Sequence, residues 1–115
     1  MQETAKAFSR HQFEKAVPFL ASTIRWNLVG EKTLEGQESV IDACKQSANY
    51  LTQVTTTFIK FKVIVGDNEV VVDSVATYTN QQQESTKVAS CDIYEFADGL
   101  VTEITSYSVD LIPTH

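Results

Sequence analysis

The spacing of apolar residues along the chain changes from a helical period to a strand period near residue 54. At the start, Gln2–Ser9 has the composition of a short helix, and a second amphipathic segment follows it. The apolar residues of this segment recur three and four positions apart, at Phe13, Ala16, Val17 and Leu20. Pro18 lacks the amide proton that would bond to Glu14, so we expect the second helix to be short or kinked.

A strand and a longer helix are predicted next. The composition of Thr23–Val29 favours a strand, which Gly30 ends. After Gly36, apolar residues return to helical spacing and predict a third helix with one buried stripe. The members of that stripe are Val40, Ile41, Cys44, Ala48 and Leu51.

From Val54 onward, the β-branched and aromatic residues predict two hairpins. The first joins Thr55–Val65 to Glu69–Thr79 through a turn at 66–68, and the polar run 80–85 forms the next loop. The second hairpin joins Lys87–Phe96 to Leu100–Leu111 through Ala97-Asp98-Gly99. Helices followed by long strands predict an α+β fold, in which a curved antiparallel sheet packs against three N-terminal helices.

The register of the second hairpin decides which residues accompany Asp92. A three-residue loop with Gly99 in the left-handed region pairs Phe96 with Leu100 and puts Asp92 opposite Ile104. A two-residue Asp-Gly turn puts Asp92 opposite Thr105 instead. This shift of one residue brings the other set of partner-strand residues onto the face of Asp92. We favour the longer loop, because it leaves the acidic pair Glu95 and Glu103 in water. In that register, these residues share the face of Asp92: Ser90, Tyr94, Phe96, Thr102, Ile104 and Ser106.

Length and charge restrict the classes of protein. The 115 residues fit a single domain spanning 1–115. Nine basic against fifteen acidic residues give a net charge of −6, which argues against nucleic acid or an anionic membrane as the partner. We find no apolar run of membrane-spanning length and no signal-peptide pattern, so the cytoplasm is the expected location. Cys44 and Cys91 both lie in apolar runs and are expected to be buried free thiols.

Two segments resemble the SnoaL-like family of the nuclear transport factor 2-like superfamily. Trp26, Gly30 and Gly36 reproduce its W-x3-G-x5-G pattern, and Cys91–Ile104 resembles its closing hairpin. The resemblance implies a cystatin-like cone, in which the sheet curls around a pocket that the helices close. The superfamily includes isomerases, cyclases, dehydratases, epoxide hydrolases and non-catalytic binding domains, so the fold alone does not give the activity.

The resemblance also implies a homodimer formed through the outer face of the sheet. The alternation of the last two strands supports this, because apolar residues lie opposite the face of Asp92. These are Cys91, Ile93, Val101, Tyr107 and Val109, mixed with Glu95, Glu103 and Lys60 or Lys62. The alternative is a twisted sheet with scattered exposed apolar residues.

Asp92 is the candidate catalytic residue. A carboxyl group among aromatic side chains loses hydration, which raises its pKa towards the range used in proton transfer. In the ketosteroid isomerase branch, the matching position holds a protonated aspartate that donates a hydrogen bond to an oxyanion. The alternative is an ionised, structural Asp92 at the rim, bonded to Ser90, Ser106 or Asn27.

The chain departs from that isomerase at two positions. Leu28 stands where the general base would be, and Thr4 aligns with the phenol of the oxyanion hole. We therefore do not expect the two-acid steroid isomerase mechanism. The polyketide cyclases of the SnoaL group, which are thought to use one aspartate as acid and base, require less of this sequence.

The sequence therefore predicts a cofactor-free cone pocket that binds a small hydrophobic or carbonyl-containing molecule, with Asp92 as the acid/base. Its predicted lining is Trp26, Leu28, Phe61, Tyr78, Tyr94, Ile104 and Ser106, with Tyr50 as a further phenol. His11 and His115 lack a partner at ligand spacing, so we expect both to be solvated and no metal site to form. The alternative is a non-catalytic binding or association module of the same fold.

Overall fold

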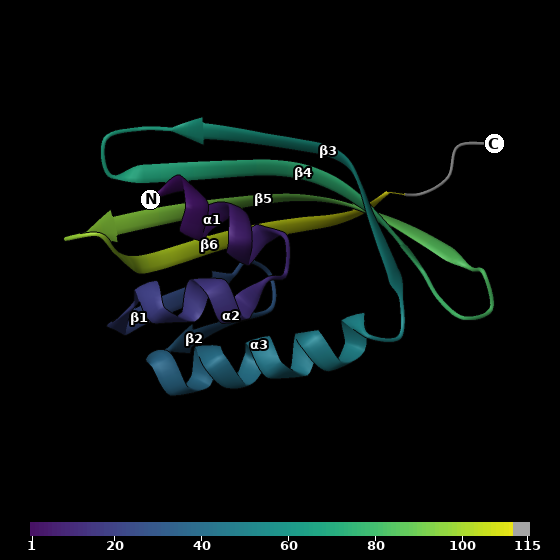
Figure 1. Ribbon diagram of the computed structural model, residues 1–115, viewed down its shortest axis with the longest axis horizontal. Helices are drawn as coiled ribbons and strands as arrows, with labels where there is room; N and C mark the ends of the chain where they lie inside the picture. The colour runs from purple at the N-terminus through teal and green to yellow at the C-terminus, as the bar shows by residue number, and fades with distance from the viewer. Residues whose placement is uncertain (112–115) are drawn as a thin grey trace.

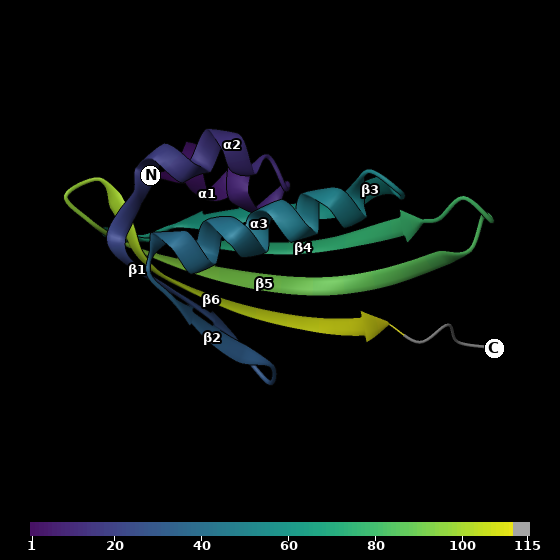
Figure 2. The ribbon, with the colours of Figure 1, turned by 90° about the horizontal axis from the view of Figure 1, so that it is seen from below.

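The computed structural model describes residues 1–111, in which one curved sheet carries all the helices on its concave side (Figures 1 and 2). The sheet has six strands in the order β2-β1-β6-β5-β4-β3. The helical segments are α1 (Gln2–Ser9), α2 (Phe13–Ala16), a 3-10 turn (Val17–Phe19) and α3 (Gln37–Leu51). The strands are β1 (Leu20–Leu28), β2 (Lys32–Glu35), β3 (Thr55–Val65), β4 (Glu69–Thr79), β5 (Ser85–Ala97) and β6 (Leu100–Leu111).

The second helix is short, as Pro18 predicts. It ends at Ala16, and Pro18 lies in the 3-10 turn that follows, where the absence of its amide proton removes no helical bond. Leu20, expected on this helix, instead begins β1 and is buried in the core. The helical spacing of apolar residues therefore holds up to the 3-10 turn, and its last member, Leu20, belongs to β1.

The sheet is mixed rather than purely antiparallel, which corrects the predicted topology. β1 runs parallel to β6, with Trp26 beside Ile104, and only its other neighbour, β2, is antiparallel to it. The sequence gives no sign of this pairing, because the two strands are almost 80 residues apart. The order of the helices also differs from the prediction: α3 follows the β1–β2 hairpin in the chain, and only α1 and α2 precede the sheet.

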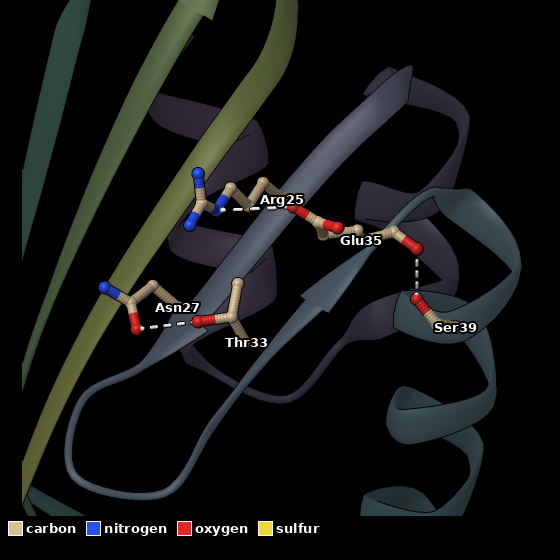
Figure 3. Close-up of polar contacts among 5 residues, drawn as sticks. All are labelled: Arg25, Asn27, Thr33, Glu35 and Ser39. Carbon is tan, nitrogen blue, oxygen red and sulfur yellow. Dashed lines mark hydrogen bonds and ion pairs between the residues drawn. The ribbon is translucent and has the colours of Figure 1, made fainter.

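β2 is a strand that the sequence analysis missed, since its four residues are mostly polar and exposed. Figure 3 shows how it is attached to β1 on one side and to α3 on the other. Arg25 forms an ion pair with Glu35 at 3.9 Å, and the Thr33 hydroxyl donates to the Asn27 side-chain oxygen at 3.2 Å. Ser39 donates to the Glu35 carbonyl at 2.6 Å, which fixes the first turn of α3 to the end of β2.

The β5–β6 hairpin has a two-residue turn followed by a bulge, so the favoured register is wrong. Asp98 and Gly99 both have positive φ, 54° and 79°, as a primed two-residue turn requires, and Ala97 pairs with Leu100. The ladder then shifts by one more residue between Glu95 and Phe96. Asp92 lies opposite Ser106, two positions from the predicted partner, so the predicted face is unchanged.

The same bulge moves Val101 from the outer face into the core. Val101 pairs with Phe96 and is 1% exposed, whereas the alternation alone placed it on the outside. Glu95 and Glu103 pair with each other on the partly solvated outer face, as predicted. Their mutual repulsion adds to the burial that raises the pKa of Glu95.

The core lies where α1, α2 and the first turns of α3 meet one end of the sheet. Phe8 is central to it and contacts Phe13, Trp26 and Tyr94 edge-to-face, at centroid distances of 5.2, 5.0 and 6.0 Å. On α3, only Val40 and Cys44 are fully buried. The second half of that helix is mostly exposed, including Ala48 of the predicted stripe, and Leu51 at its end packs against the core. This half extends over the rest of the concave face (Figure 2). No helix within residues 1–111 is long and apolar enough to cross a membrane.

Both cysteines are free thiols, as predicted, but only Cys44 is buried, whereas Cys91 is partly exposed. Burial raises the pKa of the Cys44 thiol to about 11, and the pKa of Cys91 is raised mainly by burial as well. We expect Ellman's reagent at pH 8 to titrate at most one thiol per native chain and both after unfolding in urea, because the thiolate is the reactive form. Rapid reaction of two thiols in the native protein would contradict this placement of Cys44.

Candidate functional site

A cavity of about 460 Å³ lies between the concave face of the sheet and the helices. Its helix-side wall is mostly aromatic or amphipathic: Phe8, Ser9, His11, Phe13, Gln46, Ser47, Tyr50 and Leu51. The sheet side includes many hydroxyl groups and one acid: Trp26, Leu28, Phe58, Ser74, Ala76, Tyr78, Val88, Ser90, Asp92, Ser106 and Ser108. A second hollow of the same volume, next to Lys6, Arg10 and Lys15, is lined mainly by exposed side chains. We place the candidate site in the first cavity.

Among residues 1–111, Asp92 is the only acidic residue that lines this cavity, and α1 holds its side chain in place. Ser9, the last residue of α1, donates its hydroxyl proton to Asp92 Oδ2 at 2.8 Å. The same Ser9 oxygen lies 2.6 Å from the Tyr94 hydroxyl. Because a serine has one proton to donate, Tyr94 is the donor in that second bond. The result is a buried chain of hydrogen bonds from Tyr94 through Ser9 to Asp92.

A second chain approaches Asp92 from β1. Trp26 donates its indole proton to Ser106 Oγ at 2.9 Å, and Ser106 pairs with Asp92 in the β5–β6 ladder. Burial raises the pKa of Asp92, while hydrogen bonds from Ser106 and Ser9 act in the opposite direction. The loss of hydration is the larger effect, so the Asp92 carboxylate is a stronger base than one in water.

His11 lies at the cavity instead of in solvent, which corrects the expectation for this residue. It follows α1 with φ of 65°, a left-handed conformation that costs a non-glycine residue about 1–2 kcal/mol. Its Nε2 lies 3.1 Å from the Tyr78 hydroxyl of β4, and the rings of Phe13 and Phe58 lie 5.8 and 6.0 Å from its own. Burial lowers the pKa of His11, so its imidazole is neutral at neutral pH.

Five of the eight predicted site residues line this cavity: Trp26, Leu28, Tyr78, Asp92 and Ser106. Ile104 and Tyr94 do not, because both are 0% exposed and belong to the core beneath the cavity floor. Phe61 packs against the core and against Phe58, and the Arg10 guanidinium covers its ring at 4.3 Å. Tyr94 still acts on the site, through its bond to Ser9.

The sequence analysis missed Ser9 and His11, which bind Asp92 and Tyr78 from the helix side. Both lie in the run Ser9-Arg10-His11, which has the composition of an exposed junction. Their partners are 83 and 67 residues away in the chain, so no local pattern indicates them. Strand alternation alone predicts Ser74 on the cavity face, since it alternates with Val72, Ala76 and Tyr78 on β4.

The family follows from a match over most of the chain. A model of the SnoaL-like domain matches residues 1–104. The chain belongs to this family. Within residues 1–111, this SnoaL-like domain has no cluster of three side chains of the kinds that hold a metal ion. Its sequence matches none of the curated proteins.

Solved structures support the same fold. An NTF2-like protein of unknown function from Cytophaga hutchinsonii is 27% identical, with a TM-score of 0.83 over 94% of this chain and 95% of its own. A proposed polyketide cyclase from Xanthomonas campestris has a TM-score of 0.73 at 15% identity, over 92% and 84%. An LEH-like epoxide hydrolase from M. tuberculosis has a TM-score of 0.68 at 14% identity, over 90% and 75%. At such identities, the last two show the fold alone.

Proposed function

We propose that this SnoaL-like domain binds a small carbonyl-containing or hydroxylated molecule in the cavity and acts on it as a cofactor-free isomerase or cyclase. Asp92 serves as the acid/base of that reaction. The observation that carries the proposal is the Asp92 carboxyl group, which faces a cavity, is held by Ser9, and has a pKa raised by burial. Similarity in fold to a proposed polyketide cyclase is consistent with this class of reaction.

The cavity is suited to an amphipathic ligand. Aromatic side chains, including Phe8, Phe13 and Phe58, provide flat apolar contacts, while serine hydroxyls on β4, β5 and β6 face the same space. Ser74, Ser90 and Ser108 form one row across the three strands, next to the row that contains Asp92. A ligand oxygen beside Asp92 therefore meets hydrogen-bonding groups, and the ligand's carbon skeleton meets rings.

The test is proton exchange on 2-tetralone, a bicyclic ketone with acidic protons next to its carbonyl. In D₂O, the wild-type protein is expected to accelerate loss of the α-proton NMR signals, and the Asp92→Asn variant is not. Tight binding of 2-naphthol, a planar analogue of the enol, without any acceleration of exchange would instead favour the non-catalytic binding module. The residues Leu28 and Thr4 favour that alternative, since neither supplies a base or a phenol.

The outer face of the sheet supports a second proposal, a homodimer. Tyr107 and Val109 are 47% and 60% exposed there, beside the partly buried Cys91 and Ile93. At one end of this face, Glu69, Glu95 and Glu103 form an acidic row across three strands. Lysines lie further along the face, including Lys60, which forms an ion pair with Asp73 at 2.8 Å. A two-fold packing of two copies buries the apolar centre and brings the acidic end of each copy towards the lysines of the other.

We expect analytical ultracentrifugation to show a dimer that Val109→Glu dissociates, because the change puts two charges into the proposed interface. The matched control is Phe19→Glu, which adds the same charge to an exposed apolar position on the helical side. This variant is expected to remain dimeric. A monomeric wild type at the highest concentration tested, or equal effects of the two variants, would exclude this interface.

A further inference from the structure

The pair of His11 and Tyr78 gives the cavity a second polar site that the proposed function does not use. Tyr78 lies on β4, next to the strand that carries Asp92, and lines the same cavity. His11 reaches it from the opposite wall, after the end of α1. A histidine in a left-handed backbone conformation is a costly way to fill this space, which indicates that the imidazole itself has a role.

The two groups are arranged so that Tyr78 keeps its proton. Burial and the nearby charges of Asp92 and Tyr50 all raise the pKa of the Tyr78 hydroxyl, which keeps it in the form that donates a hydrogen bond. Asp92 and Tyr78 line the same cavity, and their partners Ser9 and His11 are two residues apart in the chain, so one ligand can contact both groups. When His11 donates from Nε2 to the Tyr78 oxygen, the hydroxyl proton of Tyr78 is free to point at a ligand.

We propose that Tyr78 is the catalytic partner of Asp92, donating a hydrogen bond to the carbonyl oxygen of the ligand, and that His11 is the residue that positions it. This inference rests on the proposed function and adds the group that holds the oxygen. The Tyr78 hydroxyl takes the place of the phenol that Thr4 cannot supply.

The step balances with these two groups. The Asp92 carboxylate takes a proton from the carbon next to the carbonyl. The electron pair of that C–H bond forms a carbon–carbon double bond, and the carbonyl pair moves onto oxygen, where the Tyr78 hydrogen bond stabilises it. Return of a proton, or of a deuteron in D₂O, to carbon restores the ketone and the carboxylate.

The test compares single substitutions in 2-tetralone exchange. Tyr78→Phe removes one hydroxyl and keeps the ring, and it is expected to lower the turnover rate by about 10²- to 10³-fold, as loss of one oxyanion donor does. The matched control is Tyr107→Phe, which removes a phenol from the outer face of the sheet, away from the cavity, and is expected to change the rate by less than about threefold. Tyr78→Phe is also expected to bind 2-naphthol about fivefold to tenfold more weakly.

His11→Asn tests the positioning role, because asparagine tolerates the left-handed conformation and keeps the backbone. We expect a lower turnover rate with a nearly unchanged KM. In addition, the ¹⁵N spectrum of the wild-type His11 ring, assigned by its loss in this variant, is expected to show the Nε2–H tautomer. A merely structural histidine would leave the turnover rate unchanged in the folded variant.

The outcomes separate the two proposals. If Asp92→Asn abolishes exchange while Tyr78→Phe and Tyr107→Phe behave alike, the role of Tyr78 is excluded and the proposed function stands. If the wild-type protein does not accelerate exchange above the Asp92→Asn level, the proposed function fails and this inference fails with it. An Nδ1–H tautomer at His11 would overturn the positioning role.

Discussion

Replacing Asp92 with asparagine is expected to lower the rate of 2-tetralone exchange by about 10²- to 10⁴-fold, the usual contribution of a positioned acid/base. Asparagine has nearly the same shape and can still accept the bond that Ser9 donates at 2.8 Å, so the cavity should remain formed. What it loses is the ability to take a proton. Exchange rates are measured by NMR with the variant and the wild-type protein at equal concentration.

The control for this prediction is Asp67→Asn, which makes the same change in the exposed turn between β3 and β4, outside the cavity. Its exchange rate is expected to stay within a few-fold of the wild-type rate. Equal losses in Asp67→Asn and Asp92→Asn would mean that the rate does not depend on the Asp92 carboxyl group.

The same substitution is expected to change the pH dependence of stability. Burial raises the pKa of Asp92 in the folded state above its unfolded value of about 3.9, so the folded protein binds the proton more tightly than the unfolded chain does. The wild-type protein therefore loses stability as the pH rises from the unfolded pKa through the folded one. Asp92→Asn lacks this loss. Relative to the wild type, it should gain free energy of unfolding from pH 3 to pH 7, as urea titrations can measure.

The largest expected effect on stability comes from Ile104→Ala, at about 2–5 kcal/mol of unfolding free energy. Ile104 is fully buried, pairs with Tyr94 across the β5–β6 ladder and lies beside Trp26 in the parallel pair. Removing three carbon atoms there leaves a space that neighbouring strands cannot close without breaking their ladders. The change is measured by urea unfolding followed by tryptophan fluorescence, since Trp26 is the only tryptophan.

Ile59→Ala is the matched control for Ile104. Ile59 is 58% exposed at the bulge of the edge strand β3, so the same three carbon atoms are removed without creating a buried space. The expected loss is below about 1 kcal/mol. Similar losses for the two substitutions would contradict the burial of Ile104, and with it the sheet packing beneath the cavity.

Local patterns predicted most of the fold. The helix at Gln37–Leu51 and the strand Glu69–Thr79 are found where the spacing of apolar residues puts them, because that spacing reflects burial of one face. The parallel pairing of β1 with β6 was not predictable, since the partner of a strand is not encoded in its own alternation. The short strand β2 was missed because it buries almost nothing.

The candidate site shows the same division. Asp92 lies on the predicted face and lines the cavity, because strand alternation has a period of two and an error of two residues in the register left its face unchanged. His11 was not found, because its position depends on a left-handed residue after α1 and on a partner 67 residues away. Tyr94 was assigned to the cavity itself, whereas it contributes from below, through the hydroxyl of Ser9.

The shared hydroxyl of Ser9 links the proton affinity of Asp92 to the packing of α1 on the sheet. Ser9 is the last residue of α1 and serves both Asp92 and Tyr94, so α1 cannot rise from the sheet without taking that donor away from the carboxylate. Movement of α1 away from the sheet removes this hydrogen bond and part of the burial of Asp92 together. The docking of the helix and the charge of Asp92 therefore form one thermodynamic cycle.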